Sequence, residues 1–126
     1  MSEKLLEISG LSVCYEGEQI LNNICFSVEK GETVGIAGES GSGKSTLLRA
    51  ILRLMGKNGF ITGGQITFRG EELTDMSEKK LRSLCGSEIG MIFQNTGASL
   101  CPTRKIGAQI CESVRAHEKR CGFITP

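Results

Sequence analysis

The chain has 126 residues, which is enough for one domain of moderate size. Its 15 basic and 14 acidic residues nearly cancel, so the composition indicates neither nucleic-acid binding nor a strong field for steering anionic partners. No apolar run approaches the roughly 20 residues that span a bilayer, and we expect any membrane association to be peripheral, through a partner.

The cysteine content does not indicate a disulfide scaffold. The N-terminus lacks a secretory apolar segment, and no C-x-x-C pair is present for a zinc or thioredoxin-like site. We therefore expect free, mostly buried thiols in a reducing compartment. The six cysteines are Cys14, Cys25, Cys85, Cys101, Cys111 and Cys121.

The first part of the chain is typical of short strands. Residues 11–15 and 24–28 alternate between apolar and polar side chains, and turn-forming residues follow each of them. Residues 33–37 form a continuous small-apolar run, which predicts a strand buried on both faces. From Ser45 the apolar residues recur at helical spacing until Gly56, which predicts an amphipathic helix.

The second part continues the mixture of strands and helices. Residues 65–69 alternate like a strand, and Ser77 is a good N-cap for a short helix that ends before Gly86. Residues 89–93 predict another apolar strand. After a loop containing Pro102, apolar residues of 106–114 mark one face of a last helix.

A glycine-rich loop lies between the predicted strand 33–37 and the following helix. Its sequence, GESGSGKS over residues 38–45, matches the P-loop pattern G-x-x-x-x-G-K-[ST]. The glycines let backbone N–H groups surround phosphate, and the helix adds its positive N-terminal end. Lys44 can reach the β- and γ-phosphates, and the Ser45 hydroxyl can bind Mg²⁺. The predicted ATP-binding residues of this loop are Gly38, Glu39, Ser40, Gly41, Ser42, Gly43, Lys44, Ser45 and Thr46.

The dinucleotide pattern G-x-G-x-x-G is not met, because Thr46 stands where the third glycine belongs. A Rossmann oxidoreductase is therefore not indicated.

The loop and its flanking segments together resemble an ABC transporter ATPase subunit. The segments are LLEISGLSVCY (5–15), GESGSGKST (38–46) and IGMIFQ (89–94). The stretch QNTGASLCP (94–102), followed by IGAQI (106–110), is similar to the peptide/nickel importer branch, although Asn95, Thr96 and Cys101 replace its usual D, P and N. The resemblance covers roughly residues 4–117.

This resemblance implies roles for two more residues. Tyr15 matches the aromatic residue that stacks on adenine, with a half-buried strand tyrosine as the structural alternative. Gln94 matches the Q-loop glutamine, which contacts Mg²⁺ or the attacking water and relays the nucleotide state to the membrane subunits. Its alternative is a polar strand end.

Two other features look functional and are better explained structurally. The stretch ITGGQ (61–65) is similar to the ABC signature L-S-G-G-Q, but it precedes Gln94 and leads into an alternating strand, so we expect a strand-initiating turn. His117 is the single histidine and follows a helical pattern, so a surface helix position is expected rather than a γ-phosphate switch.

The hydrolytic machinery of the family is not matched in this sequence. After Gln94 the only acids are Glu112 and Glu118, and neither follows an apolar strand as a Walker B carboxylate would. The resemblance thus implies a partial nucleotide-binding domain over 1–126, with helical subdomain, signature and Walker B missing. The fold expected is α/β, a truncated P-loop NTPase core with an N-terminal antiparallel β-subdomain.

Three functions remain open at this stage. The first is the ATP-binding part of an ATPase that energises import of peptides, nickel or a related solute. The second is a nucleotide-binding fragment, truncated or frameshifted, with little or no turnover. The third, a small P-loop kinase, is weakened by the positions of Tyr15 and Gln94. The resemblance implies transmembrane permease subunits and a second ATPase subunit as partners, at the cytoplasmic face of the cell membrane.

Overall fold

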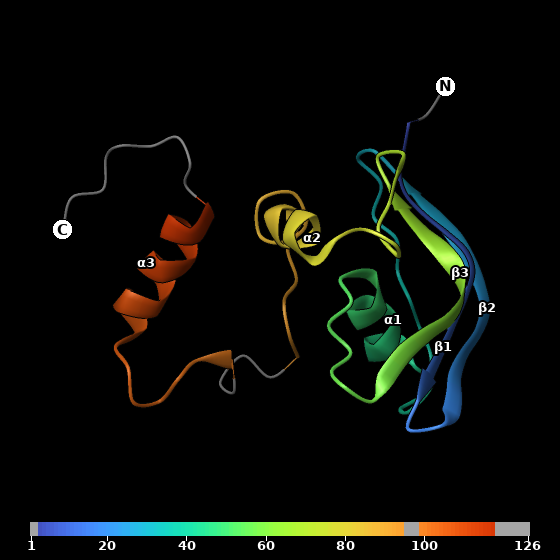
Figure 1. Ribbon diagram of the computed structural model, residues 1–126, viewed down its shortest axis with the longest axis horizontal. Helices are drawn as coiled ribbons and strands as arrows, with labels where there is room; N and C mark the ends of the chain where they lie inside the picture. Colours follow the sequence, from blue (N-terminus) through green and yellow to red (C-terminus); the bar gives the residue numbers. More distant parts are fainter. Residues whose placement is uncertain (1–2, 95–98, 118–126) are drawn as a thin grey trace. The chain divides into compact units, whose positions relative to one another are not determined.

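The computed structural model describes residues 3–94 and 99–117 (Figure 1). The chain divides into two compact units, Met1–Ser77 and Glu78–Pro126. The first contains a sheet and one helix, and the second contains two helices.

An antiparallel sheet with the strand order β2-β1-β3-β4 forms the first unit. Its strands are β1 (Lys4–Tyr15), β2 (Glu18–Glu29), β3 (Gly59–Phe68) and β4 (Glu71–Glu72). A two-residue turn at Glu16 and Gly17, with φ of 51° and 84°, joins β1 to β2, as hairpins with a primed turn require. The expected N-terminal antiparallel β-subdomain is therefore confirmed.

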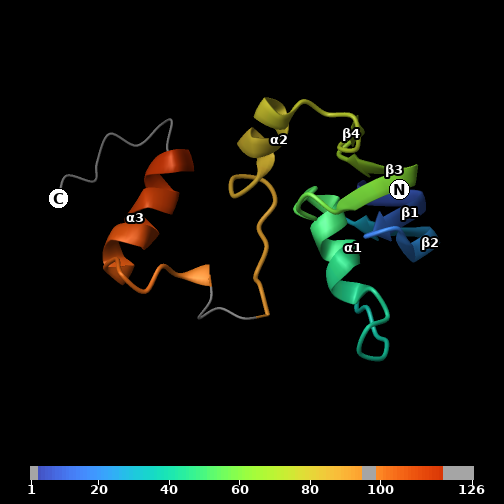
Figure 2. The same cartoon turned by 60° about the horizontal axis from the view of Figure 1, so that its bottom comes forward.

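Helix α1 (Lys44–Ile51) packs against one face of this sheet, as Figures 1 and 2 show. Its buried side chains complete a core with aliphatic residues of β1 and β3. Full burial of each such side chain is worth about 1.5–3 kcal/mol. The core residues of these elements are Ile8, Leu11, Val13, Ile66, Leu47, Ala50 and Ile51.

The segment 61–65 that is similar to an ABC signature lies inside β3, so the expected strand-initiating turn is wrong: the strand already begins at Gly59 and runs through the segment. Gly64 has φ of +84°, and β1 carries a register shift opposite it, between Ser9 and Ser12. A Cβ on Gly64 would lie 2.3 Å from the carbonyl oxygen of Gly10. The two strands therefore cross so closely at this point that only glycine fits.

Two predicted strands are wrong. Residues 33–37 and 89–93 contain no strand; Ile36 is 41% exposed and Ile92 is 88% exposed, while Ile89 and Met91 are half-buried. A buried strand must pair its backbone N–H and C=O groups with a neighbour. Within the part of the chain that the structure describes, neither segment has a paired strand, apart from one isolated bridge between Cys85 and Ile89.

The second unit contains helices α2 (Glu78–Leu84) and α3 (Ile106–His117), which confirms both predicted helices. Gly86 follows α2 with φ of 85°, the conformation expected for a C′ glycine. His117 ends α3, as its helical context predicted. In the described residues, neither these helices nor α1 has the length and apolar character needed to cross a membrane.

The Gly10–Gly64 crossing predicts that Gly64→Ala destabilises the first unit by at least about 2 kcal/mol, through backbone strain and a clash with main-chain atoms. Gly63→Ala is the matched control, because its Cβ would meet only the Ser12 Cβ at 3.9 Å. Urea unfolding of the full chain measures both. Equal midpoints for the two variants would contradict the assignment of Gly64 as the close contact.

Candidate functional site

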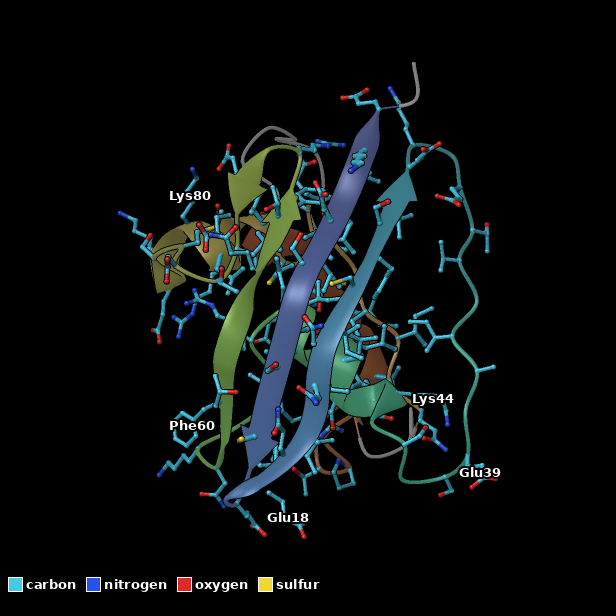
Figure 3. All side chains as sticks on the ribbon, turned by 90° about the vertical axis from the view of Figure 1, so that its right-hand side faces the viewer. Glu18, Glu39, Lys44, Phe60 and Lys80 are labelled. Atoms are coloured by element: carbon cyan, nitrogen blue, oxygen red, sulfur yellow. The ribbon has the colours of Figure 1, made fainter. Side chains whose placement is uncertain are left out.

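The P-loop is positioned by its contact with β2. After β2 the chain runs outside the sheet to the loop and then enters α1, as Figure 3 shows between β2 and the labelled Glu39 and Lys44. Gly43 lies directly on the side chains of β2, since a Cβ there would stand 2.8 Å from Leu21 Cδ2 and 3.2 Å from Ile20 Cγ2. The absence of a side chain at Gly43 thus lets α1 begin against the sheet.

The N-terminus of α1 is suited to an anion. Gly43 is its N-cap with φ of 95°, no side chain caps the helix, and its first turn carries no acidic residue. The first N–H groups of a helix lack intrahelical partners, and the macrodipole makes this end positive. The exposed Ser45 and the half-buried Thr46 stand in this first turn. The predicted glycine-rich loop that leads into a helix N-terminus is therefore present. The strand predicted before it, over residues 33–37, is not.

Lys44 folds back across the loop. Its ammonium donates hydrogen bonds to the carbonyl oxygens of Gly38 (2.5 Å) and Glu39 (2.8 Å) and to the hydroxyl of Ser42 (3.2 Å). The backbone N–H of Ser42 also donates to Glu39 at 3.1 Å, which makes the loop a tight turn. The positive charge of Lys44 is thus held inside the loop that the sequence assigns to phosphate.

These residues fit ATP with Mg²⁺. The loop from Gly38 to Ser42 is exposed, and it combines backbone donors, one ammonium and the Ser45 hydroxyl at a helix N-terminus. Mg²⁺ in nucleotide sites takes few protein ligands, with phosphate oxygens and water supplying the others. Residues 3–94 and 99–117 contain no group of three or more His, Cys, Asp or Glu that could hold a metal ion.

Tyr15 is the last residue of β1 and lies beside the start of β2, close to the residues of β2 that contact the P-loop. It pairs with Glu18, and Ile20, which touches Gly43, is two residues further along β2. Strand spacing therefore puts Tyr15 on the order of 10 Å from the start of α1. The ring is half-buried and covers Gly59, because a Cβ on Gly59 would be 2.8 Å from Tyr15 Cε2.

Gln94 belongs to the second unit, where it is exposed. The P-loop residues belong to the first unit, and the role of Gln94 as a Mg²⁺ or water contact stays a prediction. Asn95 and Thr96, which replace the usual D and P of the importer branch, lie outside the described residues.

Sequence reasoning missed the residue that organises the loop after Ser99. The Gln109 side chain accepts a hydrogen bond from the Cys101 N–H (2.8 Å) and donates to the carbonyl oxygens of Cys101 (3.0 Å) and Arg104 (3.1 Å). A carboxamide can donate and accept at once, which fixes the loop on α3. The sequence feature that could have indicated this role is the polar Gln109 within the stretch IGAQI.

The pKa of the Cys101 thiol is lowered from its usual value. The Thr103 hydroxyl, 3.2 Å from the thiol sulfur, and then the Thr103 backbone lower the pKa of Cys101 by hydrogen bonding, with a smaller contribution from the Arg104 backbone. Burial opposes this only weakly. The thiolate is therefore favoured at this exposed cysteine.

Comparison with known proteins agrees with the arrangement of these residues. Residues 21–122 match the family described as ABC transporter. The chain is 45% identical over 121 residues to the oligopeptide transport ATP-binding protein OppD of Bacillus subtilis (strain 168), covering 92% of this chain and 34% of that protein. It is 42% identical over 121 residues to the dipeptide transport ATP-binding protein DppD of Lactococcus lactis subsp. cremoris, covering 93% of this chain and 35% of that protein.

A solved structure is also similar, that of a bacterial Atm1-family ABC exporter with ATP bound. The TM-score is 0.56 at 27% identity, over 66% of this chain and 14% of the exporter chain. The chain belongs to the ABC transporter family, so the resemblance found in the sequence is confirmed. It spans about a third of the length of the curated relatives that it matches.

The lowered pKa predicts that Cys101 reacts with iodoacetamide at lower pH than an ordinary cysteine thiol does. Thr103→Val removes the main hydrogen bond and moves the midpoint of the pH–rate profile of Cys101 upward, because the thiolate loses its donor. Mass spectrometry of each alkylated cysteine measures the rates. An unchanged midpoint in Thr103→Val would contradict the hydrogen-bond explanation.

Proposed function

We propose that this chain is the ATP-binding part of an ABC-type ATPase that energises import of peptides or a related solute. The observation that carries the proposal is the loop from Gly38 to Ser45, held on β2 at Gly43, with its uncapped helix N-terminus and its lysine. The peptide-transport names of its relatives support the solute class. Nickel and related solutes remain alternatives within the same branch.

In this proposal the loop residues bind ATP and each has a distinct task. Backbone N–H groups at the start of α1 hold phosphate oxygens, Lys44 neutralises the β- and γ-phosphates, and Ser45 supplies a hydroxyl to Mg²⁺. Tyr15 stacks on adenine through its aromatic ring. Gln94 contacts Mg²⁺ or the attacking water and reports the nucleotide state to the transport subunits.

The second part of the proposal concerns ATP hydrolysis by this chain alone. The 126 residues include no match to the signature or to Walker B, so we propose that this chain alone binds ATP with little or no hydrolysis. Hydrolysis in the family role requires the complementary groups from a complete dimer of ATPase subunits. The transmembrane permease subunits of the importer are the proposed partners, and the cytoplasmic face of the membrane is the proposed location.

Lys44→Ala tests the nucleotide site. We expect a loss of Mg·ATP affinity of at least about tenfold, because charge-assisted hydrogen bonds to phosphate disappear. Isothermal titration measures the affinity, and Lys57→Ala is the control because Lys57 is an exposed lysine outside the loop. Equal affinity in both variants would refute the site. In steady-state ATPase assays, turnover that Lys44→Ala abolishes would overturn the proposed inactivity.

Tyr15→Ala separates base recognition from phosphate binding. We expect ATP affinity to fall about two- to tenfold, the range for loss of one aromatic contact. Affinity for inorganic tripolyphosphate should stay the same, because no base is involved. Tyr15→Phe, which keeps the ring, should bind ATP like the unsubstituted chain. A parallel loss of ATP and tripolyphosphate affinity would indicate that Tyr15 only supports the fold at Gly59.

A further inference from the structure

We propose that Ser42 is a positioning residue that holds the Lys44 ammonium in a closed arrangement of the loop, which phosphate has to displace. The inference rests on the proposed nucleotide site and concerns its control. Ser42 occupies a variable position of the P-loop pattern, so the motif itself assigns no role to its hydroxyl.

The closed arrangement is visible in contacts between the two arms of the loop. The hydroxyl of Ser42 stands only 2.6 Å from where a Cβ on Gly38 would be, and Lys44 Nζ stands 3.7 Å from that point. The ammonium joins both arms, since it bonds the Gly38 and Glu39 carbonyl oxygens on one side and the Ser42 hydroxyl on the other. Not even a methyl group fits between Gly38 and Ser42.

In this arrangement all three hydrogen-bond donors of the Lys44 ammonium are already in use. A lysine ammonium has three N–H donors, and its three acceptors here are all groups of the loop itself. A bond from this ammonium to phosphate therefore requires at least one loop contact to break. The apparent affinity for nucleotide is then the intrinsic affinity reduced by the open fraction of the loop.

Of the three acceptors, only Ser42 contributes a side chain, so substitution can remove it without changing the backbone. The neighbouring Ser40 provides a matched comparison, because it is an exposed serine of the same loop whose side chain makes no hydrogen bond with the described residues. Ser42→Thr keeps the hydroxyl and tests rescue.

The first experiment measures Lys44 without nucleotide. The full chain is treated with a limiting amount of an amine-acetylating reagent at fixed pH, and mass spectrometry gives the acetylation rate of Lys44 relative to the exposed Lys30 and Lys57. We expect Ser42→Ala to raise the relative rate about three- to fivefold, because one of three charge-assisted hydrogen bonds is lost. Ser42→Thr and Ser40→Ala should match the unsubstituted chain. An unchanged rate in Ser42→Ala overturns the proposal.

The second experiment measures Mg·ATP affinity of the same proteins. If both measurements report the open fraction, Ser42→Ala should raise the affinity by the same factor as the acetylation rate. A lower affinity would mean that Ser42 assists phosphate binding, and the proposed competition would be wrong. Faster acetylation with no ATP binding by any protein would support the Ser42 contact and refute the nucleotide site.

Discussion

The contact of Gly43 with β2 is the constraint on which the arrangement of the candidate site depends. A Cβ at this position would stand 2.8 Å from Leu21 Cδ2 and 3.2 Å from Ile20 Cγ2, so those side chains would have to shift for any other residue to start α1 here. Its φ of 95° also turns the chain from the loop into the helix. The loop, the helix N-terminus and the end of β2 are consequently fixed to one another by the packing that also buries Leu47 and Ala50.

The same contact relates base and phosphate recognition. Tyr15 is joined to Glu18 by the strand pairing that follows a two-residue turn, and Glu18 lies two residues before Ile20. The two-residue turn fixes the pairing of Tyr15 with Glu18, and the register then shifts at Ile20, between the pairs Cys14–Gln19 and Val13–Leu21. Tyr15 and the P-loop thus contact the same end of one hairpin. Tyr15 precedes Gly38, the first P-loop residue, by 23 positions in the sequence. The hairpin nevertheless keeps Tyr15 near the proposed phosphate site.

The sequence predicted the antiparallel β-subdomain and the three helices because these depend on local patterns, while the phosphate chemistry of the loop stays a prediction. It failed at residues 33–37 and 89–93, where composition reports that a segment is apolar but not whether a paired strand is present. It also could not foresee the Gly10–Gly64 crossing or the bonds of Gln109, since both join residues through tertiary contacts. The role of Gln94 remains a prediction for a similar reason, because it depends on how the two units meet.

The electrostatics of the loop explain why one ligand can satisfy both halves of the site. At the start of α1 the N–H groups lack a side-chain cap, while the Lys44 charge is compensated only by neutral carbonyl and hydroxyl oxygens. Both features favour negative charge, and neither can neutralise the other because both are positive. A polyanion that reaches the helix end and the ammonium together gains from each. A neutral molecule would gain from neither, so the charge distribution of the loop favours a ligand with several negative charges.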